Sequence, residues 1–128
     1  MTPGALRIKL RPAVGGHVFP LKEILEHLEA HGTWYEQVSD LQAVAPVADV
    51  VYLTRIQPDR VRTHDLSRYA LGAATLSRMK PEAIVLHPLP RTVEIDHAVD
   101  GDPRARYFQQ ATNGLYVRME LLTMVWER

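Results

Sequence analysis

Two short polar sequences each follow an apolar run, and their residue types suit the binding of an acidic small molecule. TRIQ occupies positions 54–57 and HPLPR occupies positions 87–91. Arg55 offers a planar fork of N–H donors that matches a carboxylate or a phosphate. Gln57 adds an amide two residues later, on the same side of an extended chain. We therefore expect these two side chains to bind an anionic ligand.

Three neighbouring features would support such a site. Asp59 lies four residues after Arg55, a spacing that would hold the guanidinium in place if the chain turns helical there. Pro88 and Pro90 stiffen the loop around Leu89, and an X-Pro bond in such a loop is a candidate for the cis form. A stiff loop would present its backbone carbonyls to a ligand.

Structural alternatives exist for the same residues. An arginine after a strand is commonly a surface ion pair, so Arg55 need not contact a ligand. His87, next to an apolar run, fits a hydrogen-bonded core histidine. His27 and His31 have the i, i+4 spacing of a metal pair on a helix, but the sequence offers no evident third ligand. We therefore predict no metal site.

The two polar sequences need a sheet that brings them together. The apolar runs at 50–53 and 83–86 are bounded by polar residues, which is typical of strands buried on both faces in a parallel sheet. Helical spacing of apolar residues between them predicts a helix over 65–79, ended by Pro81. This order predicts an α/β fold with an open, mainly parallel sheet flanked by helices and joined by right-handed crossovers. In such sheets ligands bind outside the carboxyl ends of the strands, where both polar sequences would lie.

The remaining pattern adds elements on both sides of this unit. We predict strands over 7–10 and around 34–38, and a helix that begins at Pro20 and ends at Gly32. A short helix is expected over 41–44. The segment 106–126 has apolar residues near one face and predicts a final helix.

Length and composition narrow the class of protein. The 128 residues fit a single domain, 1–128, and 15 basic residues balance 15 acidic ones, so no global field favours nucleic acid or an anionic membrane. The chain has no cysteine, and no apolar stretch is long enough to cross a bilayer. We expect a cytoplasmic protein that binds neither nucleic acid nor membrane.

Several sequences together resemble one family, the C-terminal, aspartate-binding domain of aspartate carbamoyltransferase. The resemblance rests on TRIQ at 54–57, HPLPR at 87–91, Glu94-Ile95, Val99-Asp100 and YFQQATNGLYVRMELL at 107–122. It runs in order over most of Asp49 to Trp126, and the first fifty residues fit more loosely. The ornithine branch of the superfamily has a cysteine where this chain has Pro88. The resemblance implies a Rossmann-like fold that is half of a carbamoyltransferase.

The resemblance also implies roles for the polar residues. Arg55 and Gln57 would grip aspartate, chiefly through its side-chain carboxylate, and the carbonyls of Pro88 and Leu89 would lie near the attacking amine and the carbamoyl group. Around them we place four supporting residues, Thr54, Asp59, His87 and Arg91. In this family the amine of aspartate attacks carbamoyl phosphate. The enzyme catalyses this step mostly by positioning the substrates and by electrostatic stabilisation, and it uses no metal or organic cofactor.

Two parts of the family's site have no counterpart in the sequence. The phosphate-binding Ser-Thr-Arg-Thr loop is absent, and no arginine can be assigned to the aspartate α-carboxylate. Three functions stay open: a carbamoyltransferase component that needs a second chain, which we place first, a non-catalytic scaffold, and a stand-alone domain acting on another acidic amino acid. In the family the last helix packs on the other domain, so Leu115, Leu122 and Val125 would lack their usual cover. We therefore expect a protein partner or a homo-oligomer through this helix.

Overall fold

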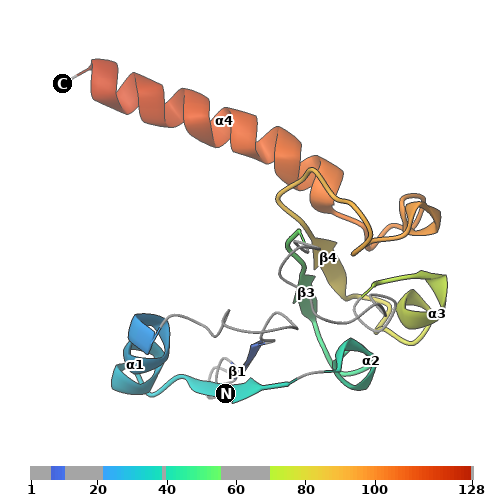
Figure 1. Cartoon of the computed structure of the whole chain (residues 1–128). Coiled ribbons are helices and arrows are strands. Elements are labelled where there is room, and N and C mark those ends of the chain that lie inside the picture. Colours follow the sequence, from blue (N-terminus) through green and yellow to red (C-terminus); the bar gives the residue numbers. More distant parts are fainter. Residues whose placement is uncertain (1–6, 11–21, 39, 56–69, 128) are drawn as a thin grey trace.

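The computed structural model describes residues 7–10, 22–38, 40–55 and 70–127 (Figure 1). The elements in chain order are β1 (Arg7–Leu10), α1 (Lys22–Ala30), β2 (Trp34–Gln37), α2 (Leu41–Val44), β3 (Val50–Tyr52), α3 (Ala73–Leu76), β4 (Ile84–Leu86), the 3-10 helix η3 (His97–Val99) and α4 (Tyr107–Trp126). Helices alternate with strands along most of this order. Each predicted strand is present within the described residues.

The described strands form two parallel pairs. β1 pairs with β2, with Arg7 opposite Trp34, and β3 pairs with β4, with Val50 opposite Ile84. In each pair a helix lies between the two strands in the sequence, because parallel strands need a crossover connection. The predicted α/β fold with parallel strands and flanking helices is confirmed.

The hydrophobic core lies around β3 and β4, and only one face of β3 is buried in it. The buried apolar residues are Leu41, Ala45, Val51, Leu71, Leu76, Met79, Ala83, Val85, Ile95, Val99 and Tyr107. Val51 points into this core, whereas Val50 and Tyr52 on the opposite face of β3 are more than half exposed. The expectation that this strand is buried on both faces is therefore wrong for the described chain.

The predicted helix over 65–79 is shorter than expected within its described part. Residues 65–69 lie outside the described chain, and α3 begins only at Ala73. Leu71 instead forms a bridge to Ile95: its N–H donates to Glu94 O at 2.9 Å, and Asp96 N–H donates to Leu71 O at 3.1 Å. Backbone pairing with a distant segment therefore overrides the local helical spacing.

Arg104 closes the carboxyl end of α3. Its Nη1 donates to Leu76 O at 2.9 Å and to Met79 O at 3.2 Å, two carbonyls at or just beyond the last turn. Asp102 fixes the guanidinium, accepting from Nε at 2.8 Å and from Nη2 at 2.9 Å. A cation at this position is favourable because it lies beside the carbonyls at the carboxyl end of a helix.

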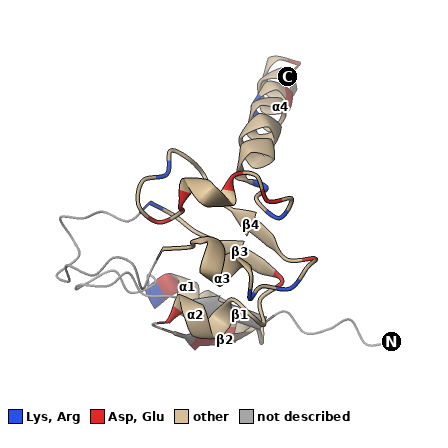
Figure 2. Cartoon of the chain, turned by 90° about the vertical axis from the view of Figure 1, so that its right-hand side faces the viewer, with Lys and Arg blue, Asp and Glu red and all other residues tan. Residues whose placement is uncertain are grey.

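The final helix, α4, projects away from the sheets (Figures 1 and 2). Of its twenty residues only Tyr107 is buried. Although it is the longest described helix, no helix in the described ranges is both long and apolar enough to cross a membrane.

Candidate functional site

The carboxyl ends of β3 and β4 meet at one edge of their sheet. Tyr52 lies opposite Leu86 in the parallel register, and Leu53 N–H donates to Leu86 O at 2.9 Å just beyond β3. Thr54-Arg55 therefore follows β3, and His87-Pro88-Leu89 follows the neighbouring end of β4. We call these five residues the β3–β4 edge. The prediction that the two polar sequences converge is confirmed for this part.

The side chains of Thr54 and Arg55 are exposed at this edge. An exposed guanidinium at the end of a parallel strand is accessible to a ligand. Gln57 and Asp59, the predicted companions of Arg55, lie outside the described residues. Their proposed contacts with a ligand and with the guanidinium stay predictions.

The loop after β4 has an unusual backbone. Leu89 has a φ of 52°, in the left-handed region that residues other than glycine rarely adopt, and the Leu89–Pro90 peptide bond is cis. The cis bond that the prolines suggested is thus present. Pro88 is exposed and Leu89 is half-buried. Leu89 N–H donates to Nδ1 of His87 at 2.8 Å, which links the loop to the buried end of β4.

His87 and Glu94 form a fully buried pair beneath this loop. Nε2 of His87 lies 3.0 Å from Oε1 of Glu94, and neither side chain is more than 1% exposed. The distance suits a hydrogen bond, but the ring N–H is not aligned well enough to form one. The two side chains are nevertheless in direct contact. Thr92 binds the same carboxylate, with its N–H at 2.8 Å and its hydroxyl at 2.7 Å, as a buried carboxylate requires.

Gln110 ties both strand ends to α4. Its Oε1 accepts from His87 N–H at 2.9 Å, and its Nε2 donates to the Tyr52 hydroxyl at 3.2 Å. The bonds therefore join the last residue of β3 to the residue that follows β4. Sequence reasoning did not single out Gln110, although it lies in the YFQQ sequence that carried part of the resemblance.

Arg91 is already bound to other side chains and is not free to grip a ligand. Its Nη1 and Nη2 both donate to the carboxylate of Asp100, the latter at 2.5 Å, and Nη2 also lies 2.7 Å from Nδ1 of His97. The Tyr107 hydroxyl accepts from Nη1 at 3.1 Å and donates to Asp100 at 2.5 Å. This arrangement fits the supporting role predicted for Arg91, because it anchors the loop after Pro90 to η3 and α4.

These contacts change the acidity of the groups involved. Hydrogen bonds from the Arg91 guanidinium lower the pKa of Asp100 to about 2 from its ordinary 3.8. Burial, followed by the hydrogen bond to Asp100, raises the pKa of Tyr107 to about 12. The hydrogen bond from Arg104 likewise lowers the pKa of Asp102 to about 2. Both carboxylates are therefore ionised at neutral pH, and the Tyr107 phenol stays protonated.

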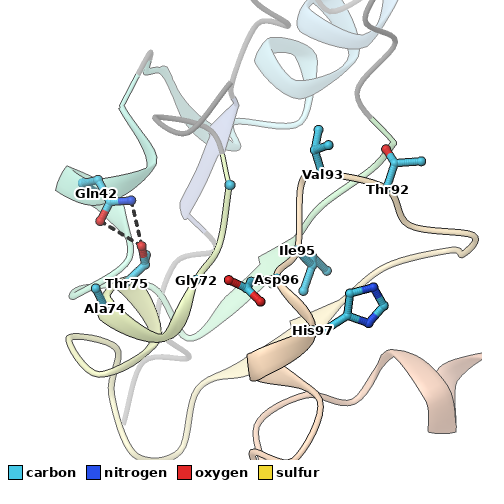
Figure 3. Close-up of a pocket in the computed structure, with 10 residues that line it drawn as sticks. Gln42, Gly72, Ala74, Thr75, Thr92, Val93, Ile95, Asp96 and His97 are labelled. Carbon is cyan, nitrogen blue, oxygen red and sulfur yellow. Dashed lines mark hydrogen bonds between the residues drawn. The ribbon is translucent and has the colours of Figure 1, made fainter. Parts of the chain in front are cut away.

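A shallow depression of about 590 Å³ lies elsewhere, between α2, α3 and residues 92–97 (Figure 3). Gln42 and Thr75 face it and bind each other, at 2.7 and 2.9 Å, and Asp96 and His97 lie across from them. None of the described residues that we predicted for the site lines it. The depression is therefore distinct from the β3–β4 edge.

The histidine pair at the carboxyl end of α1 has a local explanation. The rings of His27 and His31 lie 4.1 Å apart, and Nδ1 of His31 is 2.8 Å from the backbone oxygen of His27. Across the described segments, no group of three or more histidine or acidic side chains is arranged to hold a metal.

Comparison with known proteins relates the whole pattern to one family. A family model described as the aspartate/ornithine carbamoyltransferase Asp/Orn-binding domain matches residues 7–125. The chain is 44% identical over 119 residues to aspartate carbamoyltransferase 1, chloroplastic, of Pisum sativum, covering 88% of this chain and 31% of the pea protein. It is 45% identical over 109 residues to the chloroplastic aspartate carbamoyltransferase of Arabidopsis thaliana, covering 80% of this chain and 28% of that protein.

A solved structure gives the same relation in three dimensions. The chain superimposes on aspartate transcarbamoylase from Trypanosoma cruzi, solved in complex with carbamoyl phosphate and aspartate, with a TM-score of 0.75 and 30% identity. The match covers 89% of this chain and 38% of that one. The chain thus spans about a third of the length of each of these three relatives. It belongs to the aspartate/ornithine carbamoyltransferase family and corresponds to the Asp/Orn-binding domain.

Proposed function

We propose that the chain, as one domain over residues 1–128, is the aspartate-binding half of an aspartate carbamoyltransferase-like enzyme. The observation that carries the proposal is the β3–β4 edge, where the exposed Arg55 and the fixed loop at Leu89 leave adjacent parallel strands. Membership of the family supports it. The ligand would be aspartate or a similar dicarboxylate amino acid, with no metal or organic cofactor.

Each part of the edge has a distinct task in this proposal. The guanidinium of Arg55 binds the side-chain carboxylate of aspartate, and Gln57 adds an amide donor. The carbonyls of Pro88 and Leu89 accept from the amine and from the carbamoyl N–H groups. The amine nitrogen then attacks the carbamoyl carbon and the new C–N bond forms. The C–O bond to phosphate breaks, and the amine proton passes to the departing phosphate. The domain contributes by holding the amine in place.

In this proposal the phosphate is bound by a domain other than these 128 residues. The sequence has no Ser-Thr-Arg-Thr loop, and each curated relative named above is about three times as long as the matched part. We propose that a second chain with a carbamoyl-phosphate-binding domain completes the site.

The cellular compartment also stays a prediction: the sequence suggests the cytoplasm, whereas the pea and Arabidopsis relatives are named chloroplastic.

Complementation tests this function directly. The chain alone, mixed with carbamoyl phosphate and aspartate, is expected to give no carbamoyl aspartate above the uncatalysed rate. Addition of the amino-terminal half of a family member, which is inactive by itself, is expected to restore product formation, measured colorimetrically. Failure of every combination to form product would reject the transferase proposal. Activity of the chain alone would reject the need for a second chain.

The exposed surface of α4 supports a protein partner or a second copy of the chain. Leu115, Met119, Leu122 and Trp126 form one stripe along the helix, and Val117, Leu121 and Met124 form another on the opposite side; all seven are more than half exposed. A helix that is apolar on opposite sides is normally buried in a larger assembly. The same surface would serve a scaffold that has lost catalysis, which is the second candidate function.

Association through α4 has a clear expected outcome. The purified chain, with or without the amino-terminal half, is expected to form a complex in native mass spectrometry, and Leu122→Glu is expected to abolish it, because a carboxylate replaces an apolar side chain on the stripe. Glu120→Gln, a polar change on the same helix, is the control and should still associate. A wild-type chain that stays monomeric in both conditions would contradict the assignment.

A further inference from the structure

We infer that His87 is a positioning residue, whose Nδ1 holds the peptide group between Pro88 and Leu89 so that the Pro88 carbonyl faces the ligand. The inference rests on the proposed aspartate site and assigns a task to a buried side chain that does not itself touch the ligand. Two features carry it: the planar peptide group between Pro88 and Leu89, and the position of the proton on the His87 ring.

The ring of His87 has one arrangement that satisfies its neighbours. Leu89 N–H donates to Nδ1 at 2.8 Å, so this nitrogen carries no proton. The proton of the neutral ring is therefore on Nε2, the atom that lies 3.0 Å from the Glu94 carboxylate. The side chain of Glu94 thus favours the tautomer that leaves Nδ1 free to accept.

This hydrogen bond fixes a carbonyl as well as an N–H. The Pro88 carbonyl and the Leu89 N–H belong to one planar peptide group, which is trans because the cis bond is the next one along. In a trans peptide the two groups point in opposite directions. The N–H points to the fully buried ring, so the carbonyl of the exposed Pro88 points away from it, toward the open side of the edge.

The backbone at Leu89 needs such a contact. Its φ of 52° is costly for a leucine and persists only where surrounding contacts impose it. Gln110 holds the N–H of His87 at 2.9 Å, so the histidine is itself fixed on the backbone side. The ring therefore transmits the rigid position of β4 to the loop.

Two substitutions separate the two contacts of the ring. His87→Asn places an oxygen near the position of Nδ1, so it keeps an acceptor for Leu89 N–H and loses the contact with Glu94. His87→Gln reaches the position of Nε2, so it keeps a donor for Glu94 and loses the acceptor. Amide exchange at Leu89 should stay slow in His87→Asn and become fast in His87→Gln. In the wild type, NMR should detect a scalar coupling between the Leu89 amide nitrogen and Nδ1 of His87.

Two ligands then test the carbonyl. Aspartate has an amine that the Pro88 carbonyl accepts from, and succinate is the same dicarboxylate without it. His87→Gln is expected to weaken aspartate binding about tenfold in calorimetry and to leave succinate binding unchanged, because one hydrogen bond is lost. His87→Asn should bind both ligands as the wild type does. An equal loss for both ligands in His87→Gln would show a merely structural role and overturn the inference.

The same data distinguish failure of the inference from failure of the proposed function. Absence of the nitrogen coupling in a wild type that binds aspartate would remove the positioning role and leave the aspartate site intact. A wild type that shows the coupling but binds neither ligand, alone or with the amino-terminal half, would remove the aspartate site and the positioning role together.

Discussion

Arg55→Ala is expected to weaken the binding of both aspartate and succinate about 100-fold, which corresponds to about 2.8 kcal/mol. The size follows from the loss of two charge-assisted hydrogen bonds between a guanidinium fork and a carboxylate. Calorimetric titration of each ligand, with and without the amino-terminal half of a family member, measures the change. Because the Arg55 side chain is exposed, the variant should unfold at the same temperature as the wild type.

Two further variants give this result its meaning. Arg55→Lys keeps the charge but loses the planar fork, so it should recover only part of the affinity. Arg78→Ala removes another exposed arginine, just beyond α3, and should have no effect, which controls for a general change in charge. Indistinguishable heats for the wild type and Arg55→Ala would show that Arg55 binds no carboxylate.

The convergence of the two polar sequences was predictable because it depends on local patterns. The apolar runs around Val51 and Val85 mark strands by composition alone, and the intervening length requires a parallel crossover. Parallel pairing then brings Thr54-Arg55 and His87-Pro88-Leu89 to one edge without any further information. The prolines likewise suggested a cis peptide bond in this loop, and the Leu89–Pro90 bond is cis.

The contacts that hold this edge together depend on residues far apart in the sequence. Gln110 binds the backbone of His87, 23 positions away, and the hydroxyl of Tyr52, 58 positions away. No periodicity or spacing predicts such pairs, since they follow from where α4 begins relative to β4. The same is true of Arg104, which binds the carbonyl of Leu76 across 28 positions.

The helix predicted over 65–79 shows the opposite error, in which a local pattern was followed too far. The apolar spacing that predicted this helix runs through Ala70, Ala73 and Leu76, but the backbone of Leu71 pairs with the segment around Ile95. Gly72 then adopts an extended conformation, with φ of −109° and ψ of −179°, and α3 begins after it. Helix propensity is a weak preference, and a backbone bridge to a distant segment outweighs it.

Asp100→Asn is expected to destabilise the fold by about 3 kcal/mol, measured by urea denaturation. Asp100 accepts from both Nη atoms of Arg91 and from the Tyr107 hydroxyl, and the Arg91 side chain is only 8% exposed. The substitution removes the negative charge, so a nearly buried guanidinium loses its counter-charge. The asparagine amide faces these donors with either its NH₂ group, which cannot accept, or its neutral oxygen, which is a weaker acceptor. The expected loss lies at the lower end of the range for buried pairs because 31% of the Asp100 side chain remains exposed.

Asp49→Asn is the matched control, because it breaks an ion pair of similar type on the surface. Lys80 Nζ lies 2.6 Å from Asp49, but the two side chains are 41% and 84% exposed, so the loss of stability should stay below about 1 kcal/mol.

Acid denaturation of Asp100→Asn adds a second readout. The folded pKa of Asp100, about 2, lies below its ordinary 3.8, so its contribution is present above pH 3.8 and is lost as the pH falls toward 2. Stability should therefore fall less steeply through this window in Asp100→Asn than in the wild type. If Asp100→Asn and Asp49→Asn lowered the free energy of unfolding equally, the contacts among Arg91, Asp100 and Tyr107 would not stabilise the loop that positions the β3–β4 edge.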